Sequence, residues 1–473
     1  MLFNSVEFLL FFPIVTTLYF ILPNRWRWLL LFLASCLFYM AWIPIYVTIL
    51  FLIIIVDYIA ARKIEGATGS KRKLFLLVSV IANVSLLAIF KYYDFLCQNF
   101  TEILQVLHIS WKFPALNLIL PIGLSFHTFQ ALAYTIEVYR GNQPAERHLG
   151  IYALYVMFYP QLVAGPIERP QNLIHQFKED HQFVPENVVS GLRLMLWGFF
   201  KKIVIADRLA MLVNQVYNQP HEYSGWPLLI ATYCFAYQIY CDFSGYSDIA
   251  IGAARVMGIN LMKNFNSPYA ASNIQDFWHR WHISLSTWFR DYLYIPLGGS
   301  KCGELFRLRN IIIVFFVSGL WHGANWTFAE WGLLHGFFII VYLYWKRVSI
   351  PKILPAALHQ FISWFVTFNA ACFAWIFFRA NSIADAHWIV QHLFPLNNAD
   401  KLGHLGLTGG EILVSIVAIF ILELVQFLER NKGGVAFFEK QKLTTRWICY
   451  YTLFFIIIVL GEFGGARFIY FQF

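Results

Sequence analysis

The stretch NIIIVFFVSGLWHGANWTFAEWGLLHGFFIIVYLYW, residues 310–345, contains two apolar runs separated by a short polar hinge. Each run is long enough to cross a lipid bilayer. Since every backbone polar group inside a bilayer must be paired internally, runs of this kind fold as helices. The hinge holds His322 between Trp321 and Gly323. The stretch therefore predicts two neighbouring membrane helices with a histidine at membrane depth.

The composition of the whole chain extends this pattern. Of its 473 residues, 59% are hydrophobic, 19% are aromatic and only 13% are charged, whereas a soluble domain is nearer a quarter charged. Repeated apolar runs indicate an all-α polytopic membrane protein with about 11–12 transmembrane helices plus interfacial or re-entrant helices, and not a β-barrel. The seven cysteines are scattered without a CxxC pair, which disfavours disulfides and a zinc site.

Clusters of basic residues predict the topology. The loops 62–73 and 429–446 each hold five basic residues, so both are expected on the cytoplasmic side. Both termini are then extracytoplasmic, and the net charge of +9 is a topology signal and not a sign of nucleic-acid binding. The N-terminal run lacks the features of a cleaved signal peptide and predicts a retained helix. Further helices are expected in 28–60 (broken near Pro44) and near 74–97, 117–138, 188–212, 227–256, 310–328, 330–346, 358–378, 409–428 and 447–462, with a half-inserted segment at 150–165.

Polar residues interrupt the apolar run at QIYCDFSGYSDIAIG, residues 238–252. An acidic residue at the centre of a membrane helix costs about 2.5–3.5 kcal/mol on insertion scales. We therefore expect Asp242 and Asp248, with Ser244 and Tyr246 between them, to face protein or a water-filled cavity. A cavity wall and a helix–helix polar network both account for this pattern.

Residues 273–299, NIQDFWHRWHISLSTWFRDYLYIPLGG, have a different pattern. Aromatic and apolar residues recur every three to four positions, which predicts one amphipathic helix at the membrane interface on the cytoplasmic side. His279 and His282 could share a face of that helix and bind a metal. No third ligand is evident, so no metal site is predicted. The pattern rests on Trp278, Trp281, His282, Leu285, Trp288 and Phe289, with Arg280, Arg290 and Asp291 beside them.

Two interpretations of His322 are open at this point. Burial disfavours the charged imidazolium, and a neutral imidazole can take a proton from a hydroxyl as a general base. The alternative is a histidine that simply hydrogen-bonds to a neighbouring helix.

Four motifs carry a resemblance. YPQLVAGPIERP (159–170), DFSGYSDIAIG (242–252), NFNSPYAASNIQDFWHRWHISLSTWFRDYLYIPLGG (264–299) and GLWHGANW (319–326) resemble the membrane-bound O-acyltransferases, and most closely the bacterial branch that acetylates polysaccharides. The resemblance covers nearly the whole chain, 1–473, as one membrane domain with a catalytic core at about 120–345. It implies a ring of helices around a central tunnel.

The resemblance also implies functional residues. His322 maps onto the catalytic histidine and His282 onto a second polar position of the family. The donor is expected to be a cytoplasmic thioester, acetyl-CoA or a carrier-protein thioester, with no resident cofactor. The tunnel and donor site are expected to be lined by Asp242, Ser244, Tyr246, Asp248, Trp278, Arg280, Trp288, Arg290, Asp291, Trp321 and Asn325.

The chain ends in an aromatic tail, GEFGGARFIYFQF, whose residues 463–473 are expected to be extracytoplasmic. One interpretation is an aromatic anchor in the membrane interface. The other comes from the resemblance, because the teichoic-acid system includes a small peptide with a similar ending whose tyrosine is proposed to carry the acyl group. Tyr470 would then be a transient acyl carrier.

These features together predict an O-acyltransferase of the bacterial cytoplasmic (inner) membrane, in contact with membrane lipid. It would acetylate a cell-envelope or secreted polysaccharide through an extracytoplasmic acetyltransferase partner. A transporter or flippase of acyl donor or glycan, with His322 as a proton relay, is the alternative from another class. A relative that acylates lipids or transfers D-alanine is a third.

Overall fold

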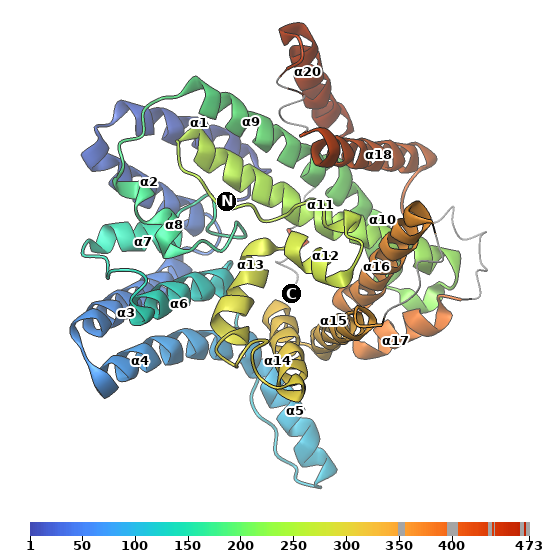
Figure 1. Ribbon diagram of the computed structural model, residues 1–473, viewed down its shortest axis with the longest axis horizontal. Helices are drawn as coiled ribbons and strands as arrows, with labels where there is room; N and C mark the ends of the chain where they lie inside the picture. The colour runs from blue at the N-terminus through green and yellow to red at the C-terminus, as the bar shows by residue number, and fades with distance from the viewer. Residues whose placement is uncertain (349–354, 395–404, 434–437, 439, 464–467, 470–473) are drawn as a thin grey trace. The chain divides into compact units, whose positions relative to one another are not determined.

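The computed structural model describes residues 1–348, 355–394, 405–433, 438, 440–463 and 468–469. Within these residues the chain is helical and contains no β-strand. It divides into two compact units, Met1–Leu192 with Ala250–Met262, and Arg193–Ile249 with Lys263–Phe473. The helices α9 (Pro185–Phe199) and α11 (Trp226–Val256) each contribute residues to both units (Figure 1).

The first unit contains the N-terminal helices. The predicted break near Pro44 is confirmed, because one helix ends at Met40 and a 3₁₀ turn begins at Pro44. The helix predicted near 74–97 is part of a longer apolar helical run, Gly69–Val106, with a π-helical turn at Ala88–Tyr92. The helices are α1 (Val6–Ile21), α2 (Asn24–Met40), α3 (Val47–Gly66), α4 (Gly69–Leu87), α5 (Tyr93–Val106), α6 (Leu124–Arg140), α7 (Leu149–Met157) and α8 (Pro170–Leu173).

Polar residues join three of these helices, which pack against one another (Figure 1). Asp57 on α3 accepts hydrogen bonds from Ser79 Oγ (2.6 Å) and from Asn83 Nδ2 (2.9 Å to its second oxygen) on α4. Ser79 Oγ also lies 3.0 Å from Thr135 Oγ1 on α6. All four side chains are buried, so the cluster satisfies a buried carboxylate with neutral donors.

The second unit begins within α9, at Arg193, and α9 then passes into a π-helical segment, η4 (Phe200–Ala206). Helices predicted near 310–328, 330–346 and 358–378 correspond to α14, α15 and α16. After η4 the elements are α10 (Asp207–Tyr217), α11, α12 (Ile274–Arg280), α13 (Ile283–Phe289), the π-helical turn η7 (Arg290–Tyr294), α14 (Glu304–His322), α15 (Trp326–Trp345), α16 (Ala356–Arg379), α17 (Ile383–His392), α18 (Gly409–Lys432) and α20 (Leu443–Leu460).

Seven helices in the described residues are long and apolar enough to cross a membrane. The protein is therefore an all-α polytopic membrane protein, as predicted. The expected arrangement as a ring around a tunnel stays a prediction, as does the larger count of spans. The seven are Pro44–Gly66, Gly69–Val106, Glu304–His322, Trp326–Trp345, Ala356–Arg379, Gly409–Asn431 and Leu443–Leu460.

Glycines let helices of the second unit approach closely. A Cβ on Gly319 of α14 would lie 2.1 Å from the carbonyl oxygen of Phe328, and one on Gly332 of α15 would lie 2.2 Å from that of Phe315. Gly198 of α9 and Gly245 of α11 meet in the same way, with Cβ atoms that would lie 2.6 and 2.8 Å from each other's carbonyl oxygens. Small residues of this kind commonly allow close packing of membrane helices. Figure 1 shows α14 and α15 as the neighbouring helices that this contact joins.

Candidate functional site

His322 is the last residue of α14, at the hinge that the sequence predicted. The next residue, Gly323, is extended, and a Cβ there would lie 2.1 Å from the ring of Phe328. Asn325 then caps α15 by accepting the N–H of Thr327 at 3.0 Å. The glycine contact between α14 and α15 lies one turn before the histidine. The hinge therefore fixes both the end of α14 and the position of His322.

Aromatic rings surround His322. Its ring meets Trp331 of α15 edge to face at 5.0 Å and Phe378 of α16 at 5.3 Å, and Trp321 lies 4.9 Å away. Only 3% of the His322 surface is exposed. An imidazole acts as a general base in its neutral form, and these apolar walls keep water away from the ring.

His282 lies between α12 and α13 and has a left-handed backbone, with φ +43°. A non-glycine residue with this φ cannot continue an α-helix. The prediction of one amphipathic interfacial helix over 273–299 is therefore wrong. The segment forms two short helices, and five of the residues that carried the pattern are buried in the protein: Trp278, Trp281, Leu285, Trp288 and Phe289.

Asn264 explains the break at His282. Its carbonyl oxygen accepts the amide N–H of Ile283 at 2.9 Å, and its side-chain oxygen lies 3.1 Å from His282 Nδ1 and accepts from Ser284 Oγ at 2.9 Å. Its amide nitrogen donates to Ser247 Oγ of α11 at 3.2 Å. These contacts orient the amide so that an oxygen faces His282. Nδ1 then carries the proton, and Nε2 is the acceptor atom of the ring.

His282 is enclosed by the protein as completely as His322. The side chain is fully buried, and this burial lowers the pKa of His282 to about 3. Trp321 contacts both histidines, since its ring lies 6.3 Å from that of His282 and 4.9 Å from that of His322. The structure thus brings the two predicted catalytic residues to one indole ring. His279 stands on α12 before the break, so the two histidines do not share one helix face.

The acidic residues of α11 pair with two consecutive lysines of η4. Lys201 Nζ lies 2.6 Å from Asp248 and 3.0 Å from Ser244 Oγ. Lys202 Nζ lies 2.6 Å from Asp242 and 2.7 Å from Asp207. The structure therefore supports the polar-network interpretation of α11, with charged partners that sequence reasoning missed. The signal was present in FFKKIVIADR, where two lysines interrupt an apolar run.

Other residues predicted to line the site have local contacts. Arg280 pairs with Asp276 one turn back at 2.8 Å, and Arg290 pairs with the adjacent Asp291 at 2.8 Å. Trp288 packs on Tyr292 at 5.1 Å. These contacts give no direct support for a role in donor binding, which stays a prediction for these residues.

Another buried histidine near the two predicted ones was missed. His335 of α15 is fully buried, and its Nδ1 accepts the indole N–H of Trp278 at 3.3 Å. It lies in an apolar run, GLLHGFF, and so carries the same signal that selected His322. It contacts Trp331 at 5.0 Å, the tryptophan that also borders His322.

The C-terminal tail returns to α11. Phe468 is buried against Tyr246 (4.8 Å) and Phe243 (5.9 Å), and the amide N–H of Ile469 donates to Asp242 Oδ2 at 2.7 Å. At these two residues the tail packs within the protein, whereas Phe463 at its start is exposed. The interpretation of the ending as an interfacial anchor stays a prediction. Tyr470 lies outside the described residues.

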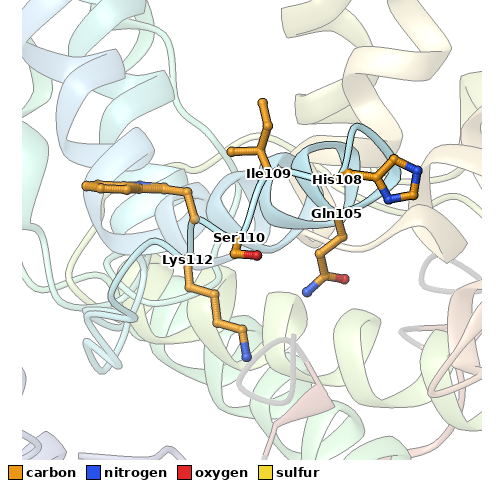
Figure 2. Close-up of a pocket in the computed structure, with 6 residues that line it drawn as sticks. Gln105, His108, Ile109, Ser110 and Lys112 are labelled. Atoms are coloured by element: carbon orange, nitrogen blue, oxygen red, sulfur yellow. The ribbon is translucent and has the colours of Figure 1, made fainter.

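Figure 2 shows a pocket of a different kind, about 530 Å³ in volume, at the end of α5. All of its lining side chains are exposed, and none belongs to the predicted site. It therefore offers no apolar enclosure of the kind that surrounds the histidines. The lining residues are Gln105, His108, Ile109, Ser110, Trp111 and Lys112.

The chain is similar in sequence to known proteins. The chain is 38% identical to a peptidoglycan O-acetyltransferase of Helicobacter pylori, over 90% of this chain and 86% of that protein. It is 35% identical to the probable alginate O-acetylase AlgI of Pseudomonas aeruginosa, over 89% and 81%. It is 28% identical to a teichoic acid D-alanyltransferase of Bacillus subtilis, over 58% and 72%.

The family model for the membrane-bound O-acyltransferases matches residues 148–384, a range that includes α11, His282 and His322. This match and the two acetyltransferase relatives favour an enzyme over the transporter alternative. The chain is a multi-pass O-acyltransferase and belongs to the membrane-bound O-acyltransferase family.

Proposed function

We propose that this enzyme moves an acetyl group from cytoplasmic acetyl-CoA across the membrane for O-acetylation of a cell-envelope or secreted polysaccharide. The observation that carries the proposal is the enclosure of His322 and His282 around Trp321. Two relatives with acetyltransferase names each match about 90% of the chain, whereas the D-alanyltransferase matches 58%. Acetyl is therefore favoured over D-alanyl as the transferred group.

His322 is the general base of the proposed reaction. An acceptor hydroxyl attacks the thioester carbonyl carbon while the neutral imidazole takes the hydroxyl proton. The C–S bond breaks, and the proton passes from His322 to the leaving thiolate, so the products are an acetyl ester and the free thiol of CoA. Aromatic walls exclude water from this step, which limits hydrolysis of the thioester.

Tyr470 is proposed as the first acceptor. A thiol, with a pKa of about 8.5, and a phenol, with a pKa of about 10, are both better leaving groups than a sugar alkoxide. A thioester, a phenyl ester and a sugar ester then form a relay that divides one difficult transfer into easier steps. Burial of Phe468 and Ile469 beside Asp242 supports this assignment, because these residues precede Tyr470 directly.

An extracytoplasmic acetyltransferase partner is proposed to move the acetyl group from Tyr470 to the polymer. The two acetylating relatives are named for different polymers, peptidoglycan and alginate. The proposal therefore leaves polymer choice to the partner. It places the enzyme in the bacterial cytoplasmic membrane with both termini on the outer face, as the basic loops 62–73 and 429–446 predict.

Donor turnover tests the proposal. Purified full-length protein in lipid nanodiscs, given acetyl-CoA without a partner, is expected to release about one equivalent of CoA, since Tyr470 can be loaded once. His322→Gln should slow this release by about 10²- to 10⁴-fold, the range for loss of a general base. His335→Gln, a matched change to another buried histidine beside Trp331, should slow it far less.

Unfolding temperatures of both variants control for misfolding. In proteoliposomes, movement of intact acetyl-CoA into the lumen without thioester cleavage would contradict the proposal. Equal loss of turnover in well-folded His322→Gln and His335→Gln proteins would remove the special role of His322.

A further inference from the structure

The C-terminal tail is held at two places, and residues 202–208 take part in both, directly at the first and through Asp242 at the second. The first place follows α20 directly. Glu462 donates its backbone N–H to the carbonyl oxygen of Ile203 at 3.0 Å. Arg208 bonds the carbonyl oxygen of Leu460 and lies 3.0 Å from the Glu462 carboxylate. The start of the tail is therefore fixed by η4 and the beginning of α10.

Close packing reinforces this first contact. A Cβ on Gly461 would lie 2.7 Å from the Ile203 side chain and 2.3 Å from the carbonyl oxygen of Ile457. Only glycine allows the chain to leave α20 this close to η4. A π-helical turn interrupts the regular α-helical ladder, and here the Ile203 carbonyl, within that turn, accepts a bond from the tail.

The second place is at Ile469, whose N–H donates to Asp242 Oδ2 at 2.7 Å. The other oxygen of Asp242 lies 2.6 Å from Lys202 Nζ. Lys202 in turn pairs with Asp207 at 2.7 Å. Lys202 and Asp207 belong to the same segment as Ile203 and Arg208, residues 202–208. We call this segment together with Asp242 the tail cradle.

A tail side chain at this second place packs on a ring that borders His282. Phe468 packs on Phe243 at 5.9 Å, and Phe243 meets His282 edge to face at 4.6 Å. One phenyl ring therefore separates the tail from His282. His282 shares Trp321 with His322.

Binding of the tail in the cradle costs conformational entropy, which the contacts must offset. Ordering a free chain end costs this entropy at every residue that becomes fixed. Side-chain packing of Phe468 and Ile469 offsets part of this, but apolar packing alone does not fix a register along the chain. A hydrogen bond from a backbone N–H to a carboxylate is both stronger than a neutral one and specific to one residue. Asp242 thus selects which peptide group lies beside α11.

We propose that Asp242, held by Lys202, is a positioning residue that sets the register of the tail, and that acetyl loading of Tyr470 depends on this register. This inference rests on the proposed role of Tyr470 as acyl acceptor. Asp242 acts through the tail backbone and takes no part in the acyl transfer itself. The adjacent pair, Lys201 with Asp248, joins the same two elements and provides a natural comparison.

The test uses full-length protein in lipid nanodiscs with two readouts. Carboxypeptidase Y digestion followed by intact-mass spectrometry reports whether residues 468–469 are protected. Acetyl-CoA treatment followed by mass spectrometry of the C-terminal peptide reports loading. In Asp242→Ala, carboxypeptidase should remove residues 468–469 at least about tenfold faster than in wild type. Acetyl loading of the C-terminal peptide should be at least about tenfold slower. Asp248→Ala should keep the tail as protected as in wild type.

Ile469→Pro gives an independent answer if Asp242→Ala does not fold. Proline removes the N–H donor and leaves Asp242 paired with Lys202, whereas Ile469→Ala trims the side chain and keeps the donor. Faster trimming and slower loading of Ile469→Pro than of Ile469→Ala, at equal unfolding temperature, would support the inference. Equal trimming of these two variants would overturn it.

The two readouts separate this inference from the proposed function. If wild-type protein releases CoA but never carries acetyl on the tail, Tyr470 is not an acyl carrier. The inference that loading depends on the tail register then fails with it. Wild-type loading that persists undiminished in Asp242→Ala and Ile469→Pro would refute the positioning role alone and leave the carrier role intact.

Discussion

Asp57 and Asp242 are both carboxylates buried in a membrane protein, but their surroundings differ. Asp57 accepts only from neutral side chains, Ser79 and Asn83 on the adjacent helix. Asp242 pairs with the cation of Lys202 and with a backbone N–H of the tail, 227 positions along the chain. Both residues are acids within apolar runs, so the sequence alone does not distinguish them. The partners show that one ties helices together and the other holds a chain segment beside the histidines.

The largest expected effect is a loss of stability when Asp57 is replaced. Asp57→Ala removes the acceptor of the buried hydrogen bonds from Ser79 and Asn83, and removing one partner of a buried hydrogen bond costs about 1–3 kcal/mol. We expect the free energy of unfolding to fall by about 3 kcal/mol, while acetyl loading per folded molecule stays near the wild-type value. Chemical denaturation in detergent micelles and the loading assay measure the two quantities.

Asp57→Asn is the matched control, because it keeps one oxygen acceptor and should lose roughly half as much stability. The comparison would fail if Asp57→Ala left stability unchanged and abolished loading. That result would place Asp57 on the path of the reaction instead of in a helix contact.

A smaller effect concerns Glu168, a third buried carboxylate, in the loop between α7 and α8. It accepts from the backbone N–H of Met262 and from Asn172 Nδ2 at 2.6 Å. Burial raises the pKa of Glu168 from its usual 4.5 to about 7. Since the folded pKa exceeds the unfolded one, its contribution to stability is complete below about pH 4.5 and is lost as the pH rises through about 7.

Between pH 6 and pH 8 we therefore expect wild type to lose about 1 kcal/mol more stability than Glu168→Gln, whose amide does not titrate. Unfolding curves at a series of pH values measure this difference. If the free energy of unfolding changed equally with pH in wild type and Glu168→Gln, Glu168 would not titrate between pH 6 and pH 8. That result would contradict the raised pKa.

Local physical rules predicted the helices well. The apolar runs around residue 322 predicted α14 and α15, because a bilayer forces such runs into helices. Pro44 predicted the break between α2 and η1, because proline commonly kinks or breaks a helix. His322 was identified from its depth and its motif, and the structure adds the aromatic walls that enclose it.

The features that the sequence did not predict depend on contacts between residues far apart in the chain. The break at His282 depends on Asn264, 18 residues earlier, and the aromatic period of the segment concealed it. The pairing of Lys202 with Asp242 spans 40 positions, and no local pattern relates the two. The return of the tail to α11 depends on a hydrogen bond to a backbone N–H, which leaves no side-chain signature.

The most direct test of the account is the mass of the C-terminal peptide after exposure of purified wild-type protein to acetyl-CoA without a partner. The account predicts one acetyl group on Tyr470 in wild type, and none in Tyr470→Phe or His322→Gln. CoA release without any acetyl on the C-terminal peptide of wild type would contradict it.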